Sequence, residues 1–177
     1  MNKLRDFKKI LISIFSFIII FSQYSCQNKN KSLQKITIAS SGKVESLDPA
    51  RVNTLKSYQL LNSLGDTLYE LNNEGVMIPK LAESMPLISK DKLKIIIRLK
   101  QNIFFHDGTP FDSSAMKFTI ERFQNIGTTK YILDKKIKSI ETPSKELLII
   151  NLNEPTSSLE GLLTSINLTA ISPSFYK

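Results

Sequence analysis

The sequence predicts an α+β fold, because hairpin strands and helices follow one another without the regular strand-helix-strand repeat of a doubly wound sheet. Two segments show the two periods most clearly. Residues 93–105 alternate apolar and charged side chains, which indicates a strand with one buried and one solvent-facing side. Residues 113–125 repeat apolar side chains every three or four positions, which indicates one buried face of a helix.

Before these segments, residues 36–40 read as a first strand, since β-branched and small residues alternate there. A helix is then expected to begin with Asn53 as its N-cap and to end near Gly65. Its apolar stripe consists of Tyr58, Leu61, Leu64 and Leu68. Residues 72–75 carry two Asn and a Gly between apolar runs, which predicts a tight turn.

In the strand at 93–105, one face carries Leu93, Ile95, Ile97 and Leu99, and the other carries Lys94, Arg98 and Lys100. Asp112 precedes the second helix and is expected to cap its free N–H groups, while Met116, Ile120 and Phe123 form the buried stripe. Residues 137–140 and 146–152 predict a hairpin, and 157–166 predict a final helix.

The composition is that of a soluble globular protein with room for one domain of ordinary size. The chain has 177 residues, of which 41% are hydrophobic and 23% charged. Its net charge of +8 includes +3 in residues 1–25, so the remaining +5 is spread thinly. The basic run at 130–138 holds a single aromatic, Tyr131, for stacking on a base. We therefore expect a solvated surface there and no nucleic-acid partner.

The amino terminus, residues 1–25, resembles a bacterial lipoprotein signal peptide. A cationic start precedes an apolar block at 10–21, which is shorter than the roughly 20 residues needed to span a bilayer. The single cysteine, Cys26, follows at once and is the expected lipidation site. Gln23 and Tyr24 depart from the usual lipobox, so an ordinary secreted protein or an uncleaved anchor stays open. Residues 26–35 are polar and are expected to form a flexible tether.

The sequence offers little that would support catalysis or metal binding. It has one histidine, one cysteine, and no zinc-protease or CxxC pattern, so we expect no metal and no cofactor. The SxxK spacing at Ser114 and Lys117 recurs at three other places and lacks its companion KTG motif, so it is attributed to chance. The chain is therefore not expected to be an enzyme.

Several phrases, in this order, resemble the extracellular solute-binding proteins of the peptide, nickel and opine type, called family 5. They are SLDPARVNT from Ser46, the PKLAES stretch from Pro79, FHDGTPF from Phe105, KFTIER from Lys117 and LTAISP from Leu168. The resemblance covers residues 36–177. Departures occur at Ala115 and Met116, where an acidic residue usually precedes the helix core, and at Asn102, where glycine is common.

The resemblance implies a periplasmic-binding-protein-like fold of class II, type C cluster. On this basis residues 36–177 are the amino-terminal part of a solute-binding domain: the first strand of the large lobe plus the accessory small domain, incomplete without the second lobe. Family members close two lobes around a ligand by hinge motion and deliver it to a membrane permease. The residues after the LDP phrase approach the ligand, which points to Asn53, Thr54 and Leu55. The competing interpretation makes Asn53 a helix cap and Leu55 a core residue.

The function implied is that of the substrate-binding component of an ABC-type importer for oligopeptides or dipeptides, lipid-anchored in the periplasm or on the outer face of the cell membrane. Its partners are a peptide or other small solute and the permease subunits. Two alternatives remain: a truncated, non-functional fragment, and a stand-alone lipoprotein with a scaffolding role.

The FHDGTPF phrase contains the single histidine, His106, which we interpret as a turn residue. Asp107 and Gly108 are expected to reverse the chain, with Gly108 at positive φ and Pro110 fixing the exit. The ring of His106 is expected to be hydrogen-bonded locally, and the neighbouring phenylalanines Phe104 and Phe105 to pack in the core.

Overall fold

The computed structural model describes residues 37, 39, 41–133, 135–155 and 158–176, and the fold concerns the compact unit Ser41–Lys177. The predicted signal peptide, the lipidation site Cys26 and the tether lie outside the described residues. Of the predicted strand at 36–40, only Thr37 and Ala39 are described, and both are exposed and lie outside any strand. A strand needs a neighbour for its backbone hydrogen bonds. No described strand pairs with these two residues.

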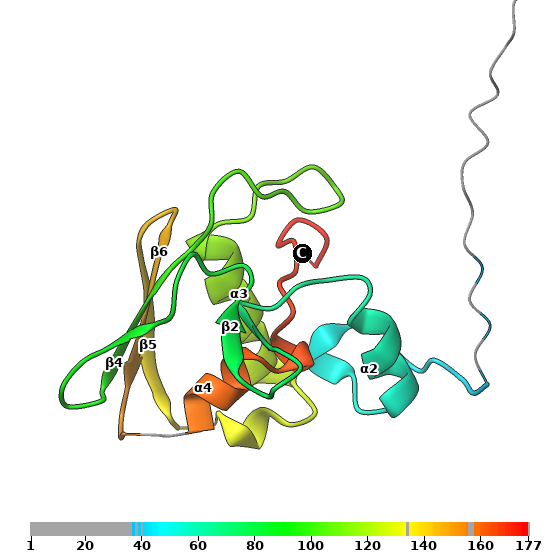
Figure 1. Ribbon diagram of the computed structural model, residues 1–177, viewed down its shortest axis with the longest axis horizontal. Coiled ribbons are helices and arrows are strands. Elements are labelled where there is room, and N and C mark those ends of the chain that lie inside the picture. Colours follow the sequence, from blue (N-terminus) through cyan, green and yellow to red (C-terminus); the bar gives the residue numbers. More distant parts are fainter. Residues whose placement is uncertain (1–36, 38, 40, 134, 156–157, 177) are drawn as a thin grey trace, which may run out of the picture. The chain divides into compact units, whose positions relative to one another are not determined.

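A four-stranded antiparallel sheet forms one layer of the unit (Figure 1). Its strands, in spatial order, are β3 (Leu87–Ile88), β4 (Lys94–Arg98), β6 (Leu147–Leu152) and β5 (Ile137–Ser144). Ile95 lies opposite Ile150, and Ile97 lies opposite Leu148, with all four side chains buried. The alternation predicted for this segment is thus confirmed, as is the hairpin of β5 and β6. Strand β5 extends through Pro143, which a sheet tolerates because β5 is an edge strand.

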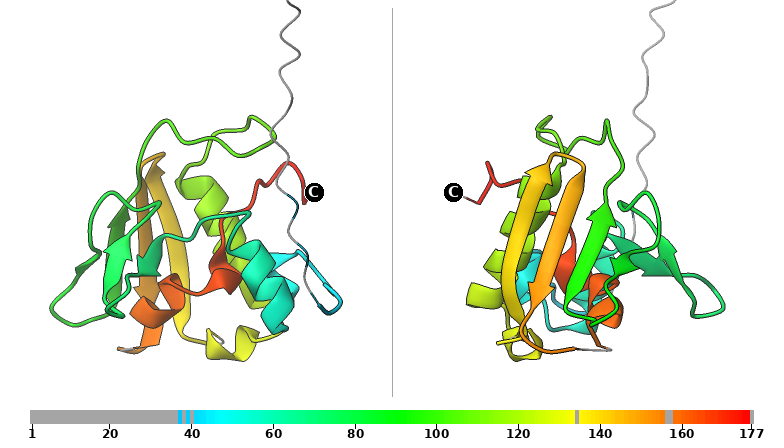
Figure 2. Two further views of the ribbon diagram at one scale, coloured as in Figure 1. Left: turned by 45° about the vertical axis from the view of Figure 1, so that its right-hand side comes forward. Right: turned by 90° about the vertical axis from the view of Figure 1, so that its left-hand side faces the viewer.

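Helix α3 (Ser113–Ile126) covers the buried face of this sheet, which faces away from the viewer in the right-hand view of Figure 2. Its predicted cap is confirmed, because Asp112 Oδ1 accepts a hydrogen bond of 3.0 Å from the Ala115 N–H. The predicted stripe is also confirmed: Met116, Ile120 and Phe123 are each at most 1% exposed. Local periodicity and a local cap were sufficient to define this helix.

The remaining elements flank α3 and the sheet. They are η1 (Pro49–Arg51), α2 (Leu55–Leu61), the hairpin of β1 (Tyr69–Leu71) and β2 (Met77–Pro79), η2 (Lys130–Ile132), α4 (Ser158–Leu163) and η3 (Ile166–Leu168). The turn predicted between the hairpin strands is confirmed, since Gly75 has φ +76° and Asn72 Oδ1 accepts hydrogen bonds from two backbone N–H groups. The predicted helix at 157–166 is shorter, because the chain leaves α4 at Leu163 and tightens into η3.

Two other boundaries differ from the prediction. Helix α2 ends at Leu61, and Leu64 is 46% exposed. The chain turns away because Gly65 lies tightly against Thr169, where a Cβ would come within 2.4 Å of the Thr169 methyl group. The strand predicted to run to residue 105 ends at Arg98, and Asn102 has φ +59°, which interrupts extended backbone.

Within the residues that the structure describes, no helix combines the length and the apolar character needed to cross a bilayer.

Candidate functional site

The aspartate of the LDP phrase, Asp48, forms an ion pair with Arg122 of α3. The two terminal guanidinium nitrogens take part, at 2.6 and 2.7 Å from the two carboxylate oxygens, and the side chains of Arg122 and Asp48 are only 15% and 18% exposed. Asp48 Oδ1 also accepts the Ala50 N–H at 3.1 Å and so caps η1. The Arg122 guanidinium carbon lies 4.3 Å from the centre of the Tyr176 ring, a cation-π distance.

The charges of this pair compensate each other in a half-buried place. Burial on its own raises the pKa of Asp48, but the hydrogen bonds and the charge of Arg122 outweigh it, so the pKa lies below its usual value. The hydrogen bond to Asp48 likewise raises the pKa of Arg122 above its usual value. Both groups are therefore ionised at neutral pH, and the pair joins η1 to α3 as a fixed two-pronged contact.

Asn167 of η3 fixes the other end of η1. Its side-chain amide donates to the carbonyl oxygens of Pro49 at 2.8 Å and Val52 at 2.9 Å. The hydroxyl of Tyr58 lies 3.0 Å from the Val52 oxygen and 3.2 Å from Asn167 Oδ1, so its single proton is shared between two acceptors. The backbone immediately before Asn53 is therefore bound from both α2 and η3.

The predicted ligand-contacting residues follow directly on this bound turn. Asn53 is exposed, Thr54 is half-buried, and Leu55 is 70% exposed at the start of α2. The competing interpretation is wrong on both counts. Thr54 occupies the N-cap position, so Asn53 is not the cap, and Leu55 does not lie in the core. Thr54 uses its hydroxyl to bond Ser57 at 3.0 Å instead of a backbone N–H group.

The FHDGTPF phrase forms the predicted turn, with Gly108 at φ +81° and the Gly108 N–H bonded to the Phe105 oxygen at 2.9 Å. Asp107 is the centre of its hydrogen bonds. Its Oδ1 accepts from the backbone and the hydroxyl of Thr109, at 2.9 and 2.6 Å. Its Oδ2 accepts the hydroxyls of Ser172 and Ser174, at 2.6 and 2.7 Å. These bonds, led by the one from Ser172, hold the pKa of the exposed Asp107 below its usual value.

His106 itself does less than predicted. It is exposed and makes no hydrogen bond to any residue in the described part of the chain, whereas its neighbour Asp107 accepts several. Phe104 is 64% exposed and so does not pack in the core. Phe105 is half-buried and meets Phe111 edge to face, with ring centres 6.0 Å apart. Only one of the two phenylalanines therefore packs as predicted.

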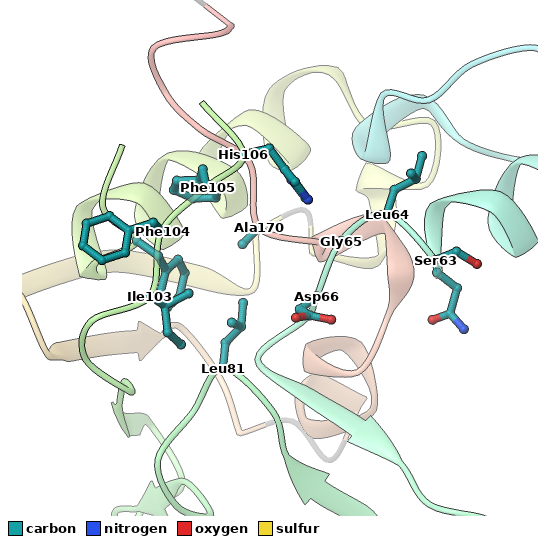
Figure 3. Close-up of a pocket in the computed structure, with 12 residues that line it drawn as sticks. Ser63, Leu64, Gly65, Asp66, Leu81, Ile103, Phe104, Phe105, His106 and Ala170 are labelled. Carbon is teal, nitrogen blue, oxygen red and sulfur yellow. The ribbon is translucent and has the colours of Figure 1, made fainter. Parts of the chain in front are cut away.

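Two hollows adjoin this turn and share Phe105, His106 and Ala170, with volumes of about 280 and 380 Å³. Figure 3 shows the first, where the loop from Ile103 to His106 lies along one side and Leu64 to Asp66 along the other. Asp66 is also bridged to Lys80 at 3.1 Å. The predicted ligand residues, from Asn53 to Leu55, line neither hollow. No signal in the sequence pointed to these hollows, because their walls come from segments that are far apart in the chain.

The described residues do not assemble a catalytic pair from the SxxK spacing. Ser114 is exposed, and Lys117 pairs with Glu121 at 3.7 Å along the same helix. Among the same residues, no group of three or more His, Cys, Asp or Glu side chains is placed to hold a metal ion. The described residues thus offer an exposed segment, Asn53–Leu55, that follows a hydrogen-bonded turn, and two hollows with mixed apolar and polar walls.

A family model described as bacterial extracellular solute-binding proteins, family 5 Middle, matches residues 76–177, more than half of the chain. Among curated relatives, the glutathione-binding protein GsiB of Escherichia coli O1:K1 / APEC is 28% identical over 142 residues. That alignment covers 79% of this chain and 28% of the relative. The chain thus spans little more than a quarter of the length of the curated relatives it matches.

Solved structures show the same fold. The Listeria monocytogenes OppA bound to peptide matches with a TM-score of 0.71 and 21% identity, over 77% of this chain and 30% of that one. The PBP AgaA in complex with agropinic acid, from A. tumefacien R10, has a TM-score of 0.71 at 23% identity, over 76% and 27%. NikZ from Campylobacter jejuni in complex with Ni(L-His) has a TM-score of 0.65 at 24% identity, over 75% and 26%. The predicted periplasmic-binding-protein-like fold is confirmed.

Proposed function

The chain belongs to the bacterial extracellular solute-binding proteins of family 5, and we propose that it serves as the substrate-binding component of an ABC-type importer for short peptides. The relatives and neighbours named above bind glutathione, a peptide, agropinic acid or Ni(L-His). Two of these four ligands are peptides, since glutathione is itself a tripeptide. This favours a peptide over the other solute classes.

We place the ligand contact at Asn53, Thr54 and Leu55. The single observation that carries this proposal is the contrast between their exposure and the rigidity of the turn before them. Leu55 is 70% exposed and follows a turn that Asn167 holds from its buried side, so the turn presents these three residues to solvent in one direction. The carbonyls of Pro49 and Val52 are already bonded within the fold, so a peptide would meet the exposed residue Asn53 and the side chain of Leu55. Exposed backbone suits a peptide, because an extended peptide is recognised largely through its main-chain hydrogen bonds.

The proposed cargo is captured outside the cytoplasm and handed to the permease, without chemical change. We propose lipidation of Cys26 as the means of retention at the membrane, on the basis of the apolar block that precedes it. Labelled palmitate should be incorporated into the wild-type chain and lost in Cys26→Ser. Equal labelling of both chains would contradict the anchor.

The test of the function is uptake. The gene is disrupted in the bacterium that produces the protein, and the import of labelled di- to pentapeptides is compared with the parent strain and with a complemented strain. We expect import to fall in the disrupted strain and to return on complementation. Unchanged import would contradict the proposal and favour a scaffolding role or a non-functional fragment.

Calorimetry tests whether this part of the protein binds a peptide by itself. Family members close two walls around the ligand, and one wall buries only part of the ligand surface. We therefore expect an isolated polypeptide of residues 26–177 to bind a tri- to pentapeptide mixture more weakly than about 1 mM. Saturable micromolar heats would instead identify a self-sufficient binding domain.

A further inference from the structure

From this geometry we propose that Asn167 is a positioning residue for the ligand-contacting segment Asn53–Leu55: its side chain holds the backbone turn that presents the segment. The inference rests on the proposed function for the identity of the segment. The contact itself joins parts of the chain that are more than 100 residues apart. η3 and η1 pack together in the fold, and in Figure 1 a red-orange segment lies beside a cyan one.

The chemistry of an asparagine side chain is what this place requires. Two carbonyl oxygens, of Pro49 and Val52, converge on one point, and each needs a donor. The amide nitrogen supplies two N–H groups, and the amide oxygen faces the hydroxyl of Tyr58. A leucine would supply none of these groups, and an aspartate would bring a charge without donors.

Burial makes the contact selective for one backbone conformation. Asn167 is 6% exposed, so water does not readily replace its amide as a donor. If the turn opens, the carbonyl oxygens are solvated again, but the buried amide loses its partners. The cost of that loss keeps the turn closed. The Val52 carbonyl is joined directly to the Asn53 nitrogen. The hydrogen bond from Asn167 to that carbonyl therefore sets the direction in which the exposed segment leaves the turn.

Other groups that hold η1 act elsewhere. Asp48 and Arg122 fix the first residues of the turn, and the Thr128 N–H bonds the Ala50 oxygen at 3.0 Å. Neither of these two contacts reaches Val52, whose own N–H bonds the backbone oxygen of Asp48 at 3.1 Å. Asn167 and Tyr58 are the side chains that bond the Val52 oxygen among the residues described here. Beyond that backbone bond, the side-chain contacts described at the carboxyl end of the turn come from this one cluster.

Limited proteolysis tests the proposal without any ligand. Arg51 is exposed, but the next residue, Val52, is 1% exposed, so trypsin can cut the bond between them only when the turn opens. Cleavage at Arg51 is followed by mass spectrometry in native buffer, well below the melting temperature. In Asn167→Leu we expect the rate to rise about tenfold or more, as the loss of buried hydrogen bonds implies.

The matched control is Ser113→Ala. Ser113 is fully buried and donates one hydrogen bond of 2.6 Å to the Ser144 oxygen, at the far end of α3 from η1. It should lower the melting temperature while leaving cleavage at Arg51 within about twofold of the wild type. Equal acceleration in both variants would mean general destabilisation and would overturn the proposal. Unchanged cleavage in Asn167→Leu would overturn it too.

If Asn167→Leu fails to fold, Tyr58→Phe takes its place, because it removes only the hydroxyl from the same cluster. We then expect an increase of about threefold at Arg51, and none means that the cluster does not hold the turn. In the uptake assay, at matched protein levels, Asn167→Leu or its substitute should lower peptide import and Ser113→Ala should not. If import never depends on this protein, the proposed function fails while the proteolysis result stands.

Discussion

Two aspartates hold turns in place by different kinds of contact. Asp48 lies half-buried and is paired with Arg122, which in turn lies over Tyr176. Asp107 is exposed and is surrounded by the hydroxyls of Ser172 and Ser174. Both have a lowered pKa. The difference teaches that a lowered pKa alone does not show where stability resides: burial and the charge of the partner decide it.

The largest effect should come from breaking the half-buried ion pair of Asp48 and Arg122. Arg122→Met removes the two short bonds to the half-buried Asp48 carboxylate and leaves it only the exposed Arg51, whose Nε lies 3.8 Å away. We expect a loss of about 3 kcal/mol in the free energy of unfolding. Urea denaturation measures this. The matched control is Arg98→Met, because Arg98 pairs with Glu83 at 3.7 Å with both side chains more than half exposed. Arg98→Met should lower the free energy of unfolding by less than about 0.5 kcal/mol. Similar losses in both variants would remove the distinction between buried and exposed pairs.

Acid should act on the two aspartates unequally. A carboxyl whose pKa is lowered in the folded chain contributes stability that is fully present above its unfolded pKa, about 3.9. That stability is lost as the pH falls through the folded pKa. We therefore expect stability to change little from pH 7 to about 5 and to fall below about 4.

Asparagine variants show which of the two aspartates causes the loss of stability at low pH. Asp48→Asn should flatten the low-pH decline more than Asp107→Asn does, because solvent screens the exposed carboxylate. Urea midpoints at several pH values between 3 and 7 give the comparison. If Asp107→Asn flattened the low-pH decline more than Asp48→Asn, the exposed turn would contribute more pH-dependent stability than the Asp48–Arg122 pair, which would contradict this expectation.

The turn at Asp107 should depend on its glycine more than on its histidine. A side chain at Gly108 would meet no atom within 4 Å, so Gly108→Ala tests only the φ of +81°. We expect a loss of about 1 kcal/mol. Gly161→Ala serves as the control, since Gly161 also has open space and lies in α4 without positive φ. It should be neutral or stabilising by up to about 1 kcal/mol, and a loss equal to that at Gly108 would argue against backbone strain.

The smallest effect should come from His106→Asn. The ring is exposed and has no hydrogen-bond partner in the described part of the chain, so we expect a change below about 0.5 kcal/mol. A thermal melt is sufficient to measure it. If peptide import were lost while the melting temperature stayed unchanged, His106 would have a binding role that its position in the turn does not explain.

How far the sequence could predict this molecule depends on whether a feature is local. The cap Asp112, the stripe of α3 and the alternation in β4 were predictable, because each follows from residues a few positions apart. The family phrases gave the order of the segments, and hence the fold. The helix predicted to end near Gly65 ends at Leu61 instead. Its end is set by the approach of Gly65 to Thr169, which no local pattern shows.

The contacts of the candidate site were beyond the sequence for the same reason. Asp48 and Arg122 lie in two separate family phrases, as do Asp107 and Ser172, but nothing within either phrase says which partner it meets. Nothing in the sequence around Asn167 singles it out, and its contacts appear only when η3 is placed beside η1. Long-range pairing of polar groups is a property of the packed fold.

The central claim is that the segment after the LDP phrase faces the ligand, and photocrosslinking tests it directly. A photoreactive benzoyl-phenylalanine replaces Leu55 in one strain and Leu71 in another; these residues are 70% and 59% exposed, and Leu71 lies in the β1–β2 hairpin. Cells importing a labelled tripeptide are then irradiated. We expect the label on the protein carrying the probe at position 55 and not at position 71. Equal labelling at both positions, or labelling only at 71, would contradict the assignment.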